Sequence, residues 1–217
     1  NIIISKEHQT GVAGIHVDSN TGQNAITVIR GAPASLTKDE IDINVIKKSK
    51  IFLTQLEIPI DVTLYCLKKA KESGLVNILN PAPACKLDKE FFSLADYFTP
   101  NEAEAEFYTG VKINNENDAK ESAKKLLELG LKKVIITLGE KGLFYSDGKE
   151  EIYIKALPFK KVEDTTGAGD AFNGGLAYAL SKNKNIKECL NIANQVAGLS
   201  TLNLGAGNSM PLLTDLK

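Results

Sequence analysis

The segment from Asp164 to Gly175, DTTGAGDAFNGG, contains residue types that can bind phosphate and move a proton. Gly167 and Gly169 let backbone N–H groups converge where a helix begins, and a helix N-terminus attracts phosphate oxygens. Asp170 follows directly, so its carboxylate could accept the proton of an attacking hydroxyl group. Taken alone, such a pattern more often marks a glycine-rich turn with an acid in the first helical turn. The chain contains no Walker A pattern.

Four other segments carry polar residues directly after apolar runs that we expect to be strands. They are Glu57 after FLTQL, NPAPA after VNIL, NEAE after YFTP, and GEKG after VIITL. Ligands of open parallel sheets bind outside the carboxyl ends of the strands. We therefore expect these four segments and the glycine-rich segment to share one rim of the sheet.

Three of these strand-end segments also have a purely structural interpretation. Asn101 and Glu104 have the spacing of a helix capping box, which we favour from the residues alone. The GEKG segment fits a β-turn closed by Gly142, and Glu57 fits a solvated residue after a strand.

The composition argues against several classes of function. With 217 residues, 43% of them hydrophobic, the chain can form an α/β domain with a substantial core. A net charge of -1 gives no electrostatic reason to expect nucleic acid or an acidic membrane as a partner. No apolar run approaches the ~20 residues of a membrane span, and we recognise no signal segment. Cys66, Cys85 and Cys189 lack metal-ligand spacing, which predicts reduced thiols in a cytoplasmic protein.

The first 35 residues differ from the rest of the chain in their predicted secondary structure. Thr10–Val17 and Asn24–Gly31 are rich in β-branched residues and flank the turn-rich DSNTGQ, which predicts a hairpin. A lone hairpin is marginally stable in water, so we expect further strands to pair with it. The chain opens on NIIISKEHQTG without Met, and we expect it to be part of a longer protein.

From residue 36 onward, predicted strands alternate with helices, which indicates a mostly parallel sheet with helices on both faces. The expected strands cover residues 50–57, 75–81, 95–100, 132–139 and, at an edge, 151–157. The expected helices cover residues 61–74, 117–130, 169–181 and 186–202. No Pro/Ser-rich linker divides this part of the chain, so we expect residues 36–217 to form one domain.

Four of the motifs, in this order and spacing, resemble the ribokinase (PfkB) family of carbohydrate kinases. They are LNPAPA, TPNEAEAEFYTG, VIITLGEKGLFY and DTTGAGDAFNGGLAYAL, and NPAPA with TPNEAEA is most similar to the ribokinase branch. The resemblance implies a ribokinase-like three-layer α/β/α fold with a mostly parallel sheet. It implies that residues 1–35 are part of a small β lid, and that residues 36–217 are the ATP-binding and catalytic core.

The resemblance implies a role for each motif. Asp170 corresponds to the catalytic base, and the backbone N–H groups of Gly167, Ala168 and Gly169 correspond to an anion hole. Glu57 and Asp170 correspond to sugar contacts. The implied nucleotide-binding residues are Asn101, Thr137, Leu138, Gly139, Glu140, Lys141, Gly142, Gly169, Asp170 and Asn194.

The same resemblance implies that the protein binds two kinds of metal ion. Glu104 corresponds to a residue that binds Mg²⁺ through water. A monovalent cation, K⁺, would lie beside the anion hole, held by Asp164, Thr166, Ser200, Asn203, Gly205 and Ser209. From the residues alone, the segment LNLGAGNS fits a helix C-cap and loop equally well, and His8 and His16 fit surface or lid positions.

The resemblance implies ATP-dependent phosphorylation of a sugar hydroxyl, first of D-ribose to ribose 5-phosphate, by a homodimer that forms through the lid. Another sugar or nucleoside kinase, for example of the fructokinase type, stays open, as does a non-catalytic nucleotide-binding module. The family's substrate-binding Asp near the first strand and its GGKGAN-like loop are not among these residues. We therefore expect the 217-residue chain alone to bind ATP better than it phosphorylates a sugar.

Overall fold

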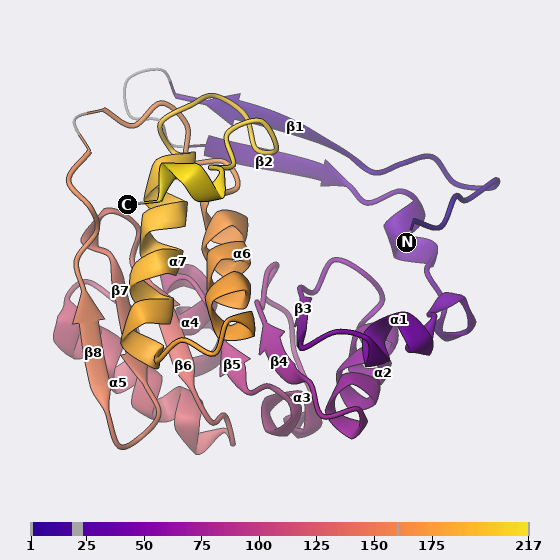
Figure 1. Ribbon diagram of the computed structural model, residues 1–217, viewed down its shortest axis with the longest axis horizontal. Helices are drawn as coiled ribbons and strands as arrows, with labels where there is room; N and C mark the ends of the chain where they lie inside the picture. Colours follow the sequence, from indigo (N-terminus) through magenta and orange to yellow (C-terminus); the bar gives the residue numbers. More distant parts are fainter. Residues whose placement is uncertain (1, 19–23, 160, 217) are drawn as a thin grey trace.

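The computed structural model describes residues 2–18, 24–159 and 161–216, and these residues contain two separate sheets. The smaller sheet is an antiparallel hairpin of β1 (Val12–Val17) and β2 (Asn24–Ile29), which confirms the hairpin predicted from the β-branched runs. The larger sheet has six strands, which lie in the order in which they follow along the chain. Figure 1 shows the hairpin standing apart from this sheet.

The larger sheet is parallel in its first part and antiparallel at one edge. Its strands are β3 (Ile51–Thr54), β4 (Val76–Leu79), β5 (Tyr97–Phe98), β6 (Val134–Thr137), β7 (Leu143–Ser146) and β8 (Glu151–Ile154). The pairs from β3 to β6 are parallel, and β7 and β8 each pair antiparallel to the strand before them. The predicted edge strand is β8, whereas β7 was not predicted.

Seven α-helices connect and cover the strands of the described residues. They are α1 (Ile43–Lys47), α2 (Ile60–Glu72), α3 (Lys89–Leu94), α4 (Glu102–Thr109), α5 (Glu116–Glu128), α6 (Ala168–Ser181) and α7 (Ile186–Ser200). Short 3₁₀ turns cover Ala32–Ser35, Lys38–Glu40, Gly139–Lys141 and Leu213–Asp215. The four predicted helices correspond to α2, α5, α6 and α7 and are confirmed, with ends that differ by at most two residues. The shorter helices were not predicted.

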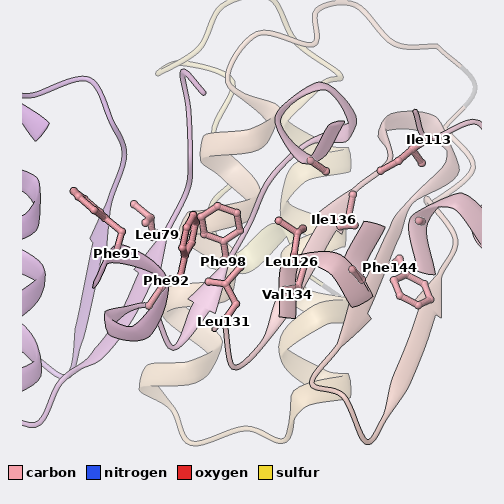
Figure 2. Close-up of a cluster of buried hydrophobic side chains, with 14 of the residues drawn as sticks. Leu79, Phe91, Phe92, Phe98, Ile113, Leu126, Leu131, Val134, Ile136 and Phe144 are labelled. Atoms are coloured by element: carbon pink, nitrogen blue, oxygen red, sulfur yellow. The ribbon is translucent and has the colours of Figure 1, made fainter. Parts of the chain in front are cut away.

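Neighbouring residues of each central strand pack on opposite faces of the sheet, because side chains alternate along a strand. Leu79, Phe98 and Ile136 belong to the core cluster shown in Figure 2, together with residues of α2, α3 and α5. Ile78 and Ile135 belong to a second cluster that contains residues of α6 and α7. The sheet is therefore covered by helices on both faces, which confirms the expected three-layer α/β/α fold (Figure 1). Within the described residues, no helix has both the length and the apolar character that a membrane span requires.

Helices α6 and α7 approach each other closely at a glycine. A Cβ atom added to Gly175 would lie 3.0 Å from Cα of Ala193 and 3.1 Å from Cβ of Val196. The preceding Gly174 is exposed, and a Cβ atom added there would meet nothing within 4 Å. Gly175 therefore leaves the space that α7 occupies, whereas Gly174 makes no such contribution.

These adjacent glycines allow the packing of α6 on α7 to be measured by substitution. Both Gly→Ala changes gain about 1 kcal/mol of helix propensity, but only Gly175→Ala crowds α7, which typically costs about 1–3 kcal/mol. We expect Gly174→Ala to raise the melting temperature by about 2–4 °C and Gly175→Ala to melt clearly below Gly174→Ala. Thermal unfolding followed by circular dichroism measures this difference, and equal melting temperatures would contradict the close approach.

Candidate active site

Two cavities open at the carboxyl ends of the parallel strands, with volumes of about 450 Å³ and 190 Å³. Both are lined by Gln55, Glu57, Asn80, Asp170 and Asn173, so they adjoin each other. The larger cavity is completed by Pro33, Leu53, Thr54 and Ile58, and the smaller one by Ala82, Thr99, Asn101, Glu104, Thr137 and Gly169. The rim predicted from the sequence is thus formed by four of the five polar segments. The GEKG segment itself does not line either cavity, although Thr137 just before it does.

Helix α6 begins at this rim with a left-handed glycine. Gly167 is the N-cap residue with a φ angle of 77°, a conformation that glycine adopts without strain. The N–H of Ala168 donates to the carbonyl of Thr165 at 3.2 Å. The N–H groups of Gly167 and Gly169 have no acceptor among the described residues. Two of the three donors expected to form an anion hole are therefore free, while that of Ala168 is used within the turn.

Asp170 lies in the first turn of α6, and its side chain is exposed to the cavities. Its Oδ1 atom accepts a hydrogen bond of 2.6 Å from the side-chain amide Nε2 of Gln55. Asp170 forms no ion pair with any residue of the described ranges. The amide of Gln55, which the sequence analysis did not single out, is thus the group that holds this carboxylate.

Three buried polar side chains tie the first turn of α6 to the ends of β4 and β5. The Thr99 hydroxyl donates to Oδ1 of Asn173 at 2.7 Å, and Nδ2 of Asn173 donates to the carbonyl of Gly169 at 2.9 Å. Nδ2 of Asn80 donates to the carbonyl of Thr99 at 2.7 Å. Buried polar groups that are paired in this way restrict the positions of their elements. The sequence analysis assigned no individual role to Asn80, Thr99 or Asn173, although Asn80 and Asn173 lie in segments that it expected at the rim.

Asn101 and Glu104 form the capping box that the residues alone favoured. The N–H of Glu104 donates to Oδ1 of Asn101 at 2.8 Å, and the N–H of Asn101 donates to Oε2 of Glu104 at 2.9 Å. Glu104 is buried, and this burial raises the pKa of its carboxyl group above the usual range despite the bond from Asn101. Both residues also line the smaller cavity, so the capping role leaves them available to a ligand.

Gly142 and the side chain of Asn194 lie against the end of β8 and the residue that follows it. Residues Gly139–Lys141 form a 3₁₀ turn, with Leu138 buried before it and Glu140 exposed. A Cβ atom added to Gly142, whose φ angle is 106°, would lie 1.9 Å from the carbonyl oxygen of Ile154. Nδ2 of Asn194 donates to the carbonyl of Lys155 at 2.9 Å. Neither Lys141 nor Asn194 lines the two cavities.

Hydrogen bonds join three of the six residues expected to hold a monovalent cation. The carboxylate of Asp164 accepts from the N–H of Thr166 at 2.8 Å and from the N–H of Gly205 at 2.9 Å. Ser200 and Ser209 are buried, and their hydroxyls donate to nearby backbone carbonyls. The structure leaves Asn203 exposed.

One polar atom in this group has no partner. The hydroxyl oxygen of Thr166 is buried and makes no hydrogen bond of good geometry with the described residues, although it lies close enough to the carboxylate of Asp164 to lower the pKa of that group. A buried hydroxyl without a partner is costly, and a bound cation with hard oxygen ligands would satisfy it. The residues present therefore fit a small cation. Among the described residues, no cluster of three or more His, Cys, Asp or Glu side chains is arranged to hold a metal ion.

Comparison with known proteins shows strong similarity along the whole chain. The family described as pfkB family carbohydrate kinase matches residues 1–213. The ribokinase of Staphylococcus aureus is 36% identical over 219 residues, a match that covers 99% of this chain and 71% of that protein. The structure of Arabidopsis thaliana ribokinase complexed with ribose and ATP gives a TM-score of 0.86 at 31% identity, covering 94% of this chain and 67% of that one.

One relative is a bifunctional protein that is longer than this chain. The ribokinase/ribose-5-phosphate isomerase A of Fructilactobacillus sanfranciscensis is 39% identical over 215 residues, which cover 97% of this chain and 39% of that protein. The chain thus spans less than half the length of this relative.

The buried carboxyl group of Glu104 predicts a pH-dependent stability difference. Because its pKa is raised in the folded chain, the stability that it contributes is present below pH 4.5, its ordinary pKa, and is lost as the pH rises through the folded value. A Gln at this position keeps the capping acceptor without the charge. We therefore expect Glu104→Gln to melt higher than wild type at pH 8 and to approach wild type at pH 4.

The matched control is Glu106→Gln, an exposed position on the same helix. Its melting temperature relative to wild type should not change between the two pH values. Differential scanning calorimetry at both pH values provides the measurement. An equal offset for Glu104→Gln at pH 4 and pH 8 would contradict the effect of burial.

Proposed function

Because the chain belongs to the pfkB family of carbohydrate kinases, we propose that it transfers the terminal phosphoryl group of ATP to a hydroxyl group of D-ribose, giving ribose 5-phosphate. The similarity to proteins named ribokinase supports this substrate. So does the similarity to a ribokinase structure that contains ribose and ATP.

One observation carries the proposal: the carboxylate of Asp170 and the free N–H of Gly169 lie in the same helical turn, where Asp170 lines both cavities and Gly169 lines the smaller one. Asp170 accepts the proton of the attacking sugar hydroxyl as general base. The N–H groups of Gly167 and Gly169, at the positive end of α6, stabilise the charge on the phosphoryl oxygens during transfer. Base and anion site are therefore adjacent, as direct transfer between two substrates requires.

The larger cavity is the proposed sugar site. Its volume of about 450 Å³ suits a small polar ligand, and Glu57, Asn80 and Asp170 line it with polar groups. Glu57 accepts hydrogen bonds from sugar hydroxyls, so that analogues without these hydroxyls leave a carboxylate unpaired. Pro33, which follows the hairpin, completes the wall, consistent with residues 1–35 acting as part of a lid beside the core of residues 36–217.

The proposed nucleotide site extends from the smaller cavity towards β8. Asn101, Gly169 and Thr137 line that cavity and bind the phosphate end of ATP. The loop from Thr137 to Gly142 contacts the rest of the nucleotide, and Asn194 lies on the adenine side. Glu104 would hold Mg²⁺ through water, and its carboxylate oxygens are the hard ligands that this ion prefers. When bound, Mg²⁺ neutralises phosphate charge.

A monovalent cation is part of the proposal because of the polar group behind the start of α6. Asp164, Thr166, Ser200, Asn203, Gly205 and Ser209 would hold K⁺ with carboxylate, hydroxyl and main-chain oxygens. The unpartnered hydroxyl of Thr166 supports this assignment. Thr166 immediately precedes Gly167, and its N–H donates to the carboxylate of Asp164. A cation that fixes these two residues therefore also fixes the free N–H groups of Gly167 and Gly169.

The hairpin is the proposed dimer contact. Ile15, Ile26 and Val28 lie on one face of the hairpin and expose 42%, 48% and 54% of their surface, which is unusual for apolar side chains of a sheet. A second copy of the chain that pairs with this sheet would cover them.

The proposed function is tested by ADP formation in a coupled assay with the complete protein and ATP. We expect ribose to support turnover, and fructose and adenosine to support far less. Asp170→Asn should reduce turnover by about 10²–10⁴-fold while ATP affinity, measured by calorimetry, stays within a few-fold. Absence of ribose-dependent ADP would overturn the ribose assignment. Unchanged turnover in Asp170→Asn would overturn the role of this residue.

The cation assignment predicts a dependence on K⁺. Replacement of K⁺ by tetramethylammonium at constant ionic strength should lower turnover, because the larger ion does not fit between Asp164 and Thr166. Thr166→Val removes the unpartnered hydroxyl and should raise the K⁺ concentration that gives half-maximal turnover. The same rate in both salts would exclude a functional K⁺ site.

A further inference from the structure

We propose that Gln55 is a positioning residue for Asp170: its side-chain amide holds one carboxylate oxygen so that the other faces the hydroxyl to be phosphorylated. This inference rests on the proposed function, because it concerns the base of that reaction. It starts from the 2.6 Å hydrogen bond from Nε2 of Gln55 to Oδ1 of Asp170, which joins residues 115 positions apart.

The backbone that carries Gln55 is held on both sides. The carbonyl of Thr54 accepts the N–H of Asn80 at 3.0 Å, and the N–H of Leu56 donates to the carbonyl of Ala82 at 2.9 Å. Leu56 is 1% exposed and anchors the segment in the core. The amide therefore extends from a rigid strand end, which is what a group that positions another side chain requires.

The charges around Asp170 explain why a neutral donor is suited to this position. Glu57 and Glu104 are the other charged residues that line the two cavities, and no Lys, Arg or His lines either one. A neutral amide can hold a carboxylate without placing a charge beside it. Lys or Arg in the place of Gln55 would hold the same carboxylate as an ion pair. The amide therefore fixes the position of the carboxylate without an ion pair.

Two consequences follow if the amide is removed. The carboxylate can rotate away from the sugar hydroxyl, so kcat falls while the KM for ATP is kept. The ionised form also loses a donor beside Glu57, so the acid limb of the pH profile of kcat/KM moves to higher pH. A residue that only fills space would change neither the pH profile nor kcat selectively.

The experiment compares Gln55→Met, which keeps the length of the side chain without the donor, with Gln55→Glu and wild type in the complete protein. We expect Gln55→Met to lower kcat by about tenfold, with the KM for ATP within about twofold of wild type, and to shift the acid limb upward by about 0.5–1 pH unit. Gln55→Glu should shift it further, because two adjacent carboxylates share a proton. Gln195→Met, on α7 and outside both cavities, makes the same chemical change and should leave kcat and the profile unchanged.

A pH profile in Gln55→Met identical to that of wild type would overturn the proposal, as would an increase in kcat/KM, which would show that the amide obstructs the base. If Gln55→Met does not fold, Gln55→Asn, which carries the same amide on a shorter side chain, should give the same shifts. A second measurement needs no turnover: the carboxyl ¹³C signal of Asp170, assigned with Asp170→Asn, should titrate at higher pH in Gln55→Met. An unchanged titration would overturn the proposal even if wild type phosphorylates no sugar, an outcome that would count against the proposed function alone.

Discussion

The site depends on where helix α6 begins and in which direction it runs. The left-handed Gly167 sets its first residue, and Gly175 lets it lie close against α7. The bond from Thr99 to Asn173 fixes the height of its first turn over the sheet. Because Asp170 and the free N–H of Gly169 belong to that turn, a shift of the helix would move the proposed base and the proposed anion site together. Their relative geometry is therefore a property of one rigid element.

The helices and strands that carry a long hydrophobic pattern could be predicted from the sequence. Helix α5 has a full amphipathic stripe, and β6 is a continuous β-branched run, so each was predicted from its own residues. The short elements lack such patterns. Helix α3 spans six residues and is held by the burial of Phe91 and Phe92, and β7 is recognised only through its pairing with β6 and β8. Tertiary packing that no local pattern records determines these elements.

The residues of the candidate site likewise fall into two groups: those that the local sequence indicates and those that it does not. The glycine-rich turn and the capping box of Asn101 and Glu104 are local, and the sequence indicates both. Gln55 and Thr99 act through partners 115 and 74 residues away, so nothing in their own neighbourhoods identifies them. A single polar residue at the end of a strand is too common a feature to predict such a bond. The use of the Ala168 N–H within its own turn likewise follows from exact backbone angles that the residue types do not specify.

The strand order has a consequence for how the chain is made. From β3 to β8 each strand pairs with the one before it, so the sheet can assemble progressively as a ribosome delivers the chain. Helices α6 and α7 come after the six strands of this sheet, and until they are present no helix of the described residues covers the sheet face around Ile78, Ile135 and Tyr145. During synthesis, therefore, the chain exposes an apolar sheet face, and a chaperone that binds nascent chains would find it there. Asp170, the proposed base, arrives only with the helix that closes this face.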